Sequence, residues 1–450
     1  MNSWAECYGC RSSQIHCAVL KKHGLNTQMK GSMQRLCFVV QRYGKDVLGG
    51  SEQLTRCYAQ LLKRDYEIHV ATTCAADHAT WRNHFPEGIT NEEDIIVHRF
   101  PNDFERTEHF HKLHYELILR HLFVQDSPVT SVGEWHRLWT EPMRKQLLIR
   151  AVENLSQADQ EEFERHQGPY SSAFLHFLER EHKNYDAVVF FTYLYPTTYF
   201  GSFKVPSHKR ILVPTLHDEP CAYLPIFREM AESFARLIFL SPGERSYAKK
   251  IWKLSAPGTI IGMPVEAVSP KTALTKPCPS PPYVVYCGRI DEQKGSHTLF
   301  EYFLRYKENN PSDLKLVLTG HADEPVPVHS DIVYLGYVEE AYKSAILKQA
   351  AIFIHPSPFE SFSIVLLEAF LNGTPALVNA NSLILTEHCR TANAGLWYET
   401  YEEFAECLSL LISDPKVRNT LGENGRQYVQ QNYSTEVILP NLKKVLDEYM

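Results

Sequence analysis

The 450-residue sequence contains no run of about 18 apolar residues, so it predicts no membrane-spanning helix. The N-terminal stretch also lacks the continuous apolar segment that a secretory signal peptide needs. The net charge is −7, which provides no excess of basic residues for a nucleic-acid partner. A P-loop and a G-x-S-x-G nucleophile elbow are both absent. These absences predict a cytoplasmic protein that binds no nucleic acid and uses neither of those two chemistries.

Disulfide bonds are not expected, because the eleven cysteines are odd in number and lie mostly inside apolar runs, as Cys37 and Cys287 do. The one close pair, Cys7 and Cys10, has no second pair of ligands nearby at a spacing suited to zinc. We therefore interpret residues 1–33 as a disordered extension rather than as a metal or redox site.

Short apolar runs bounded by turn residues recur through the chain, and helical patterns separate them. This alternation is typical of parallel sheets covered by helices on both faces. We predict an α/β protein with two Rossmann-like, doubly wound parallel-sheet domains that face a cleft, at residues 34–263 and 283–450. Residues 264–282 hold five prolines after Pro264 and are expected to form a linker, and the last helix is expected to pack back on the first domain. The predicted strands lie at residues 35–40, 67–72, 95–99, 187–192, 210–214, 236–241 and 259–263, and then at residues 283–287, 314–319, 332–335, 351–355, 376–379 and 395–398.

Residues 103–185 break this rhythm, because they hold few strand signals and many charged and aromatic helix formers. We predict that they form a helical insertion in the first domain. Its aromatic and basic stretch has two interpretations, namely packing within the insertion or contact with an anionic membrane surface. Three histidines of the insertion, His109, His111 and His114, are interpreted as part of a solvated helix face rather than as metal ligands. The aromatic and basic stretch comprises Trp135, Arg137, Trp139, Arg144, Lys145 and Arg150.

The most specific motif is ESFSIVLLE at residues 360–368, directly after a predicted buried strand. Glu360 lies in the loop at the carboxyl end of that strand, where sheets of this kind bind ligands. Glu368 lies in the following apolar helix, and a carboxylate buried there is costly unless a partner donates hydrogen bonds to it. The two hydroxyls of a ribose are one such partner, and the amides at the helix start near Phe362 and Ser363 suit a phosphate. The structural alternative is that Glu360 caps the helix and Glu368 faces solvent or a lysine.

Two basic residues follow the first predicted strand of the second domain, in the segment VVYCGRIDEQKG. Gly288 turns the chain, and Arg289 and Lys294 flank the loop before the next helix. Two cations at the carboxyl end of a strand would neutralise a pyrophosphate and stabilise it as a leaving group. Without the surrounding pattern, these two residues would be interpreted as a solvated pair.

The first domain has a glycine turn and a histidine at equivalent strand ends. Gly49 and Gly50 precede a predicted helix, where the backbone can approach a phosphate and helix amides are available. An ordinary turn needs the same glycines, and Glu52 would also suit the positive end of the helix dipole. His217 stands just beyond the predicted strand at residues 210–214, although an isolated histidine is more often structural.

Together these segments resemble the retaining glycosyltransferases of the GT-B fold, specifically glycosyltransferase family 4. The resemblance covers nearly all of residues 34–450 and is carried by E-x7-E at 360–368, G-R-x4-K-G at 288–295 and GG-x-E at 49–52. It implies four catalytic residues, of which His217 and Glu360 contact the transferred sugar while Arg289 and Lys294 bind the donor diphosphate. It also implies that Glu368 holds the donor ribose. The full donor-binding set comprises Gly49, Gly50, Arg289, Lys294, Gly320, Tyr337, Val338, Glu360, Ser361, Phe362, Ser363 and Glu368, with Gly320, Tyr337 and Val338 lining the base.

One position departs from the family pattern, because Ser363 stands where many relatives have glycine. A small side chain keeps the amide accessible, so little harm is expected from this change.

The resemblance implies transfer of a sugar from a nucleoside-diphosphate donor to a hydroxyl acceptor with retention of configuration, in polysaccharide or glycoconjugate synthesis. The expected partners are the nucleotide sugar and a sugar or glycolipid acceptor, with peripheral contact at the inner face of the membrane if the acceptor is lipid-linked. No cofactor and no metal are expected, because no DxD-type dyad is placed to bind an ion. The alternatives are a non-catalytic subunit that binds nucleotide sugars and a GT-B epimerase or phosphorylase.

Overall fold

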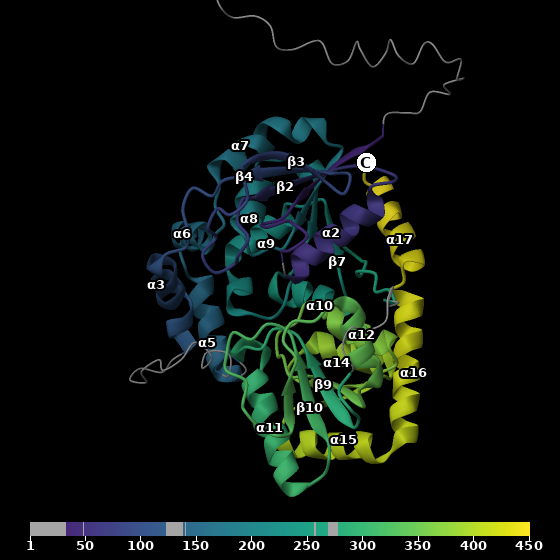
Figure 1. Cartoon of the computed structure of the whole chain (residues 1–450). Coiled ribbons are helices and arrows are strands. Elements are labelled where there is room, and N and C mark those ends of the chain that lie inside the picture. The colour runs from purple at the N-terminus through teal and green to yellow at the C-terminus, as the bar shows by residue number, and fades with distance from the viewer. Residues whose placement is uncertain (1–32, 48, 123–137, 140, 256–257, 269–277) are drawn as a thin grey trace, which may run out of the picture.

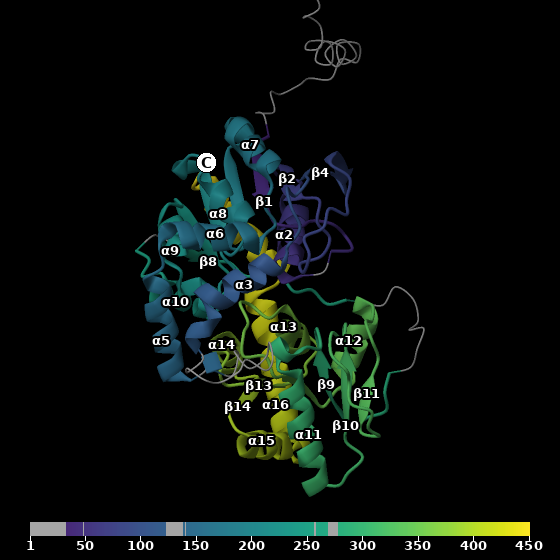
Figure 2. The same ribbon diagram turned by 90° about the vertical axis from the view of Figure 1, so that its left-hand side faces the viewer.

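The computed structural model describes residues 33–450 apart from residues 48, 123–137, 140, 256–257 and 269–277. Its strands form two Rossmann-like sheets, which lie one beyond the other in Figures 1 and 2. The α/β class and the two sheets are as the sequence predicts. Cys7, Cys10 and nearly all of the predicted extension lie outside the described residues.

The first sheet is built from strands of the segment that precedes the proline-rich stretch. Its core is parallel, and the buried strand β1 pairs with β2 on one side and with β5 on the other. One edge differs from the prediction of a wholly parallel sheet, because β3 pairs with β4 in antiparallel fashion. The sequence did not indicate β3, since its residues are largely exposed and form no apolar run. The strand order is β3 (Gly88–Glu92), β4 (Ile95–Phe100), β2 (Glu67–Thr73), β1 (Arg35–Val39), β5 (Ala187–Phe191), β6 (Arg210–Val213), β7 (Arg236–Phe239) and β8 (Gly258–Ile260).

The second sheet is parallel throughout its described strands. The strand β9 lies in its centre, between β10 and β12, and every residue of β9 is buried. The order is β11 (Ile332–Tyr334), β10 (Lys315–Thr319), β9 (Tyr283–Cys287), β12 (Ile352–His355), β13 (Ala376–Asn379) and β14 (Gly395–Tyr398). In both sheets the chain adds strands first on one side of the opening strand and then on the other, which creates a ligand-binding crevice at the reversal.

The described part of residues 103–185 consists of helices joined by short loops, and it contains no strand. Its helices α3, α5 and α6 lie on one side of the first sheet, at the left in Figure 1. The aromatic core of the insertion includes Phe110 and Phe163, whose rings pack with centroids 5.8 Å apart. The elements are α3 (Glu108–Leu117), η1 (Leu119–Leu122), α5 (Pro142–Glu153), α6 (Gln157–Gln167), α7 (Ser172–Glu181) and η2 (His182–Asn184).

The remaining helices cover the faces of the two sheets. Those of the first half are α2 (Gly50–Leu62), α8 (Pro196–Ser202), η3 (Ser207–Lys209), η4 (Pro220–Tyr223), α9 (Pro225–Glu232) and α10 (Pro242–Ile251). Those of the second half are η5 (Glu292–Lys294), α11 (Ser296–Asn309), α12 (Glu340–Gln349), α13 (Ile364–Leu371), α14 (Leu383–Ala392), α15 (Tyr401–Ser413), α16 (Pro415–Asn432) and α17 (Thr435–Asp447). None of the helices in the described ranges combines the length and the apolar character needed to cross a bilayer.

The C-terminal helices connect the two halves. In Figure 1, α16 and α17 run in yellow along one side of the molecule, from the second sheet back to the first. The Lys443 ammonium lies 2.8 Å from the Asp65 carboxylate, and the Tyr66 hydroxyl donates to Asp447. One apolar cluster continues from the first sheet through Ile261 to Tyr433 and the second sheet, so the two halves share buried surface.

Candidate functional site

Three of the predicted site residues meet at the reversal point of the second sheet. Arg289 and Lys294 follow β9, and Glu360 follows β12, which is the neighbour of β9 on the other side of the reversal. Because parallel strands end at the same edge, two loops 66 residues apart in sequence come together, and Lys294 Nζ lies 2.6 Å from Glu360 Oε1. The topology therefore assembles two cations and a carboxylate where such folds bind ligands.

Glu360 is held as a buried carboxylate. Its side chain is 11% exposed, and His355 Nε2 lies 3.4 Å from the oxygen that Lys294 contacts. Burial alone would raise the pKa of Glu360, but the charge of Lys294 outweighs it, so the pKa is lowered overall. Burial lowers the pKa of His355 to about 4, so this imidazole is neutral at physiological pH. The negative charge of Glu360 is therefore compensated by the ammonium of Lys294.

Arg289 reaches toward the first domain. Its guanidinium forms an ion pair with Asp291, and Nη1 lies 3.4 Å from Nε2 of His78, in the loop after β2. The guanidinium of an arginine can only donate hydrogen bonds, so Nε2 of His78 must be the acceptor in this contact. The pKa of His78 is lowered, first by burial and then by the charge of Arg289. A cation of the second domain thus lies next to a neutral imidazole of the first.

His217 belongs to the first domain and lies close to the Glu360 loop of the second domain. It follows β6, and its ring centroid is 6.4 Å from that of Phe359, the residue before Glu360. Its Nε2 lies 3.4 Å from Glu219 Oε2. Burial would lower the pKa of His217, but Glu219 reverses this and Glu360 adds to the reversal, so the pKa is raised. A partly cationic imidazole therefore borders the carboxylate loop.

A buried glutamate, Glu244, accepts hydrogen bonds from the backbone near His217 and so holds its loop in place. Glu244 Oε1 accepts from the Leu216 amide at 2.7 Å, and Oε2 accepts from the Leu240 amide at 2.5 Å. At the start of the same loop, Thr215 has φ +50°, and Thr192 at the end of β5 has φ +68°. Positive φ is rare for β-branched residues, and such strain is concentrated at ligand sites. These two threonines follow β5 and β6, at the edge of the first sheet that carries His217.

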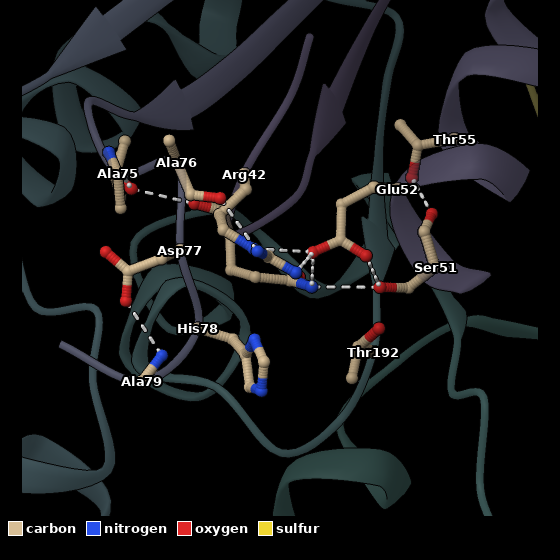
Figure 3. A network of polar contacts seen from close by, with 12 residues as sticks. Arg42, Ser51, Glu52, Thr55, Ala75, Ala76, Asp77, His78, Ala79 and Thr192 are labelled. Atoms are coloured by element: carbon tan, nitrogen blue, oxygen red, sulfur yellow. Dashed lines mark hydrogen bonds and ion pairs between the residues drawn. The ribbon is translucent and has the colours of Figure 1, made fainter. Parts of the chain in front are cut away.

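Glu52, which follows the glycine turn, belongs to a buried polar network, shown in Figure 3. Glu52 has a 2% exposed side chain, lies 2.6 Å from Nη2 of Arg42 and accepts from Gln41 and Ser51. A side chain at Gly49 would place Cβ 2.1 Å from Glu52 Oε2, whereas a Cβ at Gly50 would meet nothing within 4 Å. Glu52 is therefore more than a charge at the helix dipole, because it ties the start of α2 to the end of β1.

Glu368 lies inside α13 against a lysine that the sequence did not single out. Lys343 Nζ is 2.8 Å from Glu368 Oε2 and also 2.8 Å from Glu340 Oε2. Burial raises the pKa of Glu368, Lys343 opposes this, and Glu340 adds to the rise. The adjoining cavity is about 20 Å³, which holds about one water molecule. The structural alternative for Glu368 predicted such a lysine, and a ribose would fit only after Lys343 moves.

Two backbone positions of the motifs show why a small residue stands there. Gly320, after β10, has φ +134°, and a Cβ would lie 1.9 Å from the carbonyl oxygen of Gly288, after β9. Ser363 has φ +59° at the start of α13, and its Oγ has no hydrogen-bond partner among the described residues. The left-handed conformation favours glycine, so serine at this position carries a backbone cost of about 1–2 kcal/mol that the sequence interpretation did not expect.

The other predicted residues are placed as follows. Phe362 is 3% exposed and packs on Tyr433 with centroids 5.5 Å apart, so its side chain belongs to the core. Ser361 and Val338 are partly buried, and Tyr337 is exposed in the loop after β11.

Within the described part of the aromatic and basic stretch, Trp139, Arg144 and Lys145 make contacts within the protein, whereas Arg150 is exposed. Trp139 is 2% exposed, and Lys145 Nζ lies 4.4 Å from its ring and 2.5 Å from the carboxylate of Asp218. Arg144 pairs with Glu141 at 2.6 Å. Trp135 and Arg137 lie outside the described residues.

Sequence reasoning missed three residues of this site, namely His78, Lys343 and His355. His355 ends a predicted buried strand directly before the E-x7-E motif, and that position could have identified it. His78 and Lys343 lie far in sequence from the groups they contact, and no local pattern marks them.

Comparison with known proteins supports the likeness seen in the motifs. Residues 276–428 match the family of glycosyl transferases group 1. An uncharacterised glycosyltransferase of Methanocaldococcus jannaschii is 26% identical over 181 residues, which are 37% of this chain and 46% of that protein. The capsular polysaccharide biosynthesis glycosyltransferase CapM of Staphylococcus aureus is 23% identical over 177 residues, again 37% of this chain and 46% of that protein. The chain thus spans less than half the length of these relatives.

Solved structures match over more of the chain. HepE of Anabaena, in complex with UDP and glucose, covers 92% of this chain and 99% of its own, with a TM-score of 0.58 and 15% identity. At that identity the likeness concerns the fold, and it shows that the two sheets are arranged as in GT-B structures.

Proposed function

We propose that this protein, whose residues 276–428 match the family of glycosyl transferases group 1, transfers a sugar from a nucleoside-diphosphate donor to a hydroxyl acceptor with retention of configuration. One observation carries the proposal. Lys294 and Glu360 pair at the reversal point of the second sheet, in a loop that borders His217 of the first domain, and Arg289 of the same strand end contacts His78 of the first domain. The second domain thus presents cations suited to a diphosphate and a carboxylate suited to sugar hydroxyls, and the first domain borders them.

In the proposed reaction, the bond between the anomeric carbon and the diphosphate oxygen breaks while the acceptor oxygen attacks from the same face. The transition state resembles an oxocarbenium ion, and the acceptor proton passes to the departing diphosphate. Arg289, Lys294 and the amides at the start of α13 would stabilise the negative charge that develops there. Closure of the two domains would exclude water that otherwise hydrolyses the donor.

The ion pair between Lys294 and Glu360 suggests how the two groups would bind a donor. In the structure, the charge of each side chain compensates that of the other. A bound diphosphate would share Lys294, and Glu360 would then accept hydrogen bonds from sugar hydroxyls instead. His217 would orient the sugar, and its raised pKa favours a role in stabilising negative charge rather than as a nucleophile.

Glu368 is proposed to hold the ribose of the donor. Its carboxylate already faces a donor group, the ammonium of Lys343, so a ribose diol would replace or share that partner. Gly49 and Gly50 are proposed to close over the phosphates, and Gly320, Tyr337 and Val338 to line the base. The site needs no metal in this scheme, since Arg289 and Lys294 supply the positive charge.

The acceptor is proposed to be a sugar or glycolipid, in line with the capsular polysaccharide role named for CapM. We assign this protein to family 4 of the glycosyltransferases on its E-x7-E and G-R-x4-K-G segments. Contact with a membrane would have to use residues other than Trp139 and Lys145, because these two pack within the protein.

The first test is thermal stabilisation by UDP, GDP and ADP of wild type, Glu368→Ala and Glu301→Ala. A ligand that binds only the folded state stabilises it by about 2.7 kcal/mol at a hundredfold excess over its Kd. We expect one nucleotide to raise the Tm of wild type and of the control Glu301→Ala, whose residue is exposed on α11, but not of Glu368→Ala. If none of the three shifts wild type, the donor-site proposal fails.

The second test concerns turnover and stereochemistry. A panel of sugars on the nucleotide that binds would be incubated with candidate acceptors, and the anomeric proton coupling of the product would be read by NMR. Retention is expected, and inversion would refute the proposed mechanism. Release of nucleotide without any acceptor would instead indicate an epimerase or hydrolase, and binding without turnover would indicate a non-catalytic subunit.

A further inference from the structure

A second cluster of chemically capable side chains lies on the helical insertion. It consists of His109 on α3 with Glu162 and His166 on α6, and their ligand atoms all lie within 4.8 Å of one another. Both histidines approach the same carboxylate oxygen, Glu162 Oε1, with His166 Nε2 at 3.1 Å and His109 Nε2 at 3.7 Å. Among the described residues, no other group of three such side chains converges in this way.

The packing of two helices builds this cluster. Glu162 and His166 are four residues apart and therefore share one face of α6. Phe110 of α3 and Phe163 of α6 are both buried and pack together, which sets the two helices side by side. The imidazole of His166 is edge-on to that of His109, with centroids 4.5 Å apart. The three side chains are thus brought together by the core beneath them.

Direct hydrogen bonding explains only part of this arrangement. The contact between His166 and Glu162 has hydrogen-bond length, but the 3.7 Å between His109 and Glu162 is too long. Two ligand atoms of a tetrahedral ion with bonds of about 2.0–2.2 Å are about 3.4 Å apart, and this distance lies between the two observed separations. Two imidazole nitrogens and one carboxylate oxygen are a donor set that zinc and other divalent first-row ions favour.

We propose that His109, Glu162 and His166 bind one divalent transition-metal ion, with Zn²⁺ as the best match to the donor set. His109 and Glu162 are about half exposed, at 49% and 47%, so the ion can enter and water can complete its coordination. The ion joins α3 to α6 and stabilises the fold of the insertion. This site is separate from the proposed donor site, and neither proposal depends on the other.

The test uses the full chain, free of any affinity tag and treated with a chelator, titrated with Co²⁺ and then Zn²⁺. We expect one equivalent of Co²⁺ to give weak visible bands without a thiolate charge-transfer band, and Zn²⁺ to displace it. Replacing a residue that only hydrogen-bonds to a metal ligand lowers metal affinity about 10–100-fold. Replacing a ligand itself, as in His166→Gln or Glu162→Gln, should therefore lower the affinity at least tenfold. His111→Gln, an exposed change on α3 outside the cluster, should leave affinity unchanged.

A second readout guards against misfolded variants. Without metal, the Tm of His166→Gln and Glu162→Gln should equal that of wild type, and the rise in Tm on adding Zn²⁺ should be lost in both. Three outcomes would overturn the site: no Co²⁺ or Zn²⁺ binding by wild type, wild-type affinity in both variants, or a thiolate band that persists in them. The last outcome would place the ion on cysteines, such as Cys7 and Cys10.

Discussion

The buried ion pair between Glu52 and Arg42 allows a stability prediction with a worked magnitude. Their side chains are 2% and 8% exposed, and the charged atoms lie 2.6 Å apart. Glu52→Gln removes the negative charge and sets an amide NH2 among groups that donate to the carboxylate, including Gln41 and Ser51. Breaking a buried pair in this way costs about 3–5 kcal/mol, because the buried guanidinium of Arg42 loses the carboxylate that it pairs with.

The expected change in Tm follows from the size of the unfolding unit. Unfolding entropy is about 2.1 cal/mol/K per residue, or roughly 0.5 kcal/mol/K for the segment at residues 34–263. Glu52→Gln should therefore lower the Tm by roughly 6–10 °C if that segment unfolds alone, and by about half as much if the whole chain unfolds together. Differential scanning calorimetry would measure the shift and distinguish the two cases.

The matched control is Glu105→Gln, the same chemical change in an exposed pair. Arg82 and Glu105 have side chains 70% and 48% exposed, and such pairs contribute about 0–1 kcal/mol. The control should shift Tm by no more than about 2 °C. If Glu52→Gln lowers Tm no further than this control does, the pair is not the buried interaction described and the glycine turn is held by other contacts.

Two further predictions concern the strand ends at the site. Gly320→Ala should destabilise by at least about 2 kcal/mol, because its Cβ would lie 1.9 Å from the Gly288 carbonyl oxygen. Gly336→Ala, also at positive φ but with nothing within 4 Å, should cost only about 1–2 kcal/mol, and equal denaturation midpoints would contradict this reasoning. Burial raises the pKa of Glu244 to about 8, so the folded state keeps a proton that the unfolded state loses above about pH 4.5. Its contribution to stability should fall as pH rises between these values, by at most about 1.4 kcal/mol per pH unit, and Glu244→Gln should remove that slope in urea titrations at several pH values. Parallel pH profiles for wild type and Glu244→Gln would show that the carboxyl does not titrate in this range.

Much of the fold could be predicted because buried parallel strands are continuous apolar runs. The run at Tyr283–Cys287 predicts β9 within its observed bounds, and those at Ala376–Asn379 and Gly395–Tyr398 do the same for β13 and β14. The edge strand β3 could not be found in this way. It lies in a polar hairpin whose turn uses Glu93 and Asp94 at positive φ, in place of the Asn-Gly or Asp-Gly pair that usually marks such a turn.

The candidate site was predictable to the extent that its residues lie next to strand ends. Arg289, Lys294 and Glu360 could be placed at one edge from strand positions alone, since parallel strands end together. Their partners could not be predicted, because a pair such as Lys343 and Glu368 depends on how α12 packs against α13. The neighbours of His109 could not be predicted either. The sequence predicts a solvated helix residue there, and only the packing of α6 against α3 places Glu162 and His166 beside it.

The sequence by itself determined the two α/β halves, the helical nature of the insertion and the loops that carry the motifs, because these depend on local periodicity and on residues near in sequence. The tertiary structure decided which charges are paired and which face the gap between the halves. It placed Glu52 on Arg42, Lys294 on Glu360, and Arg289 against His78 of the other half. Such contacts depend on how separate elements dock, since burial and the short range of hydrogen bonds fix a partner only once both groups are held in space.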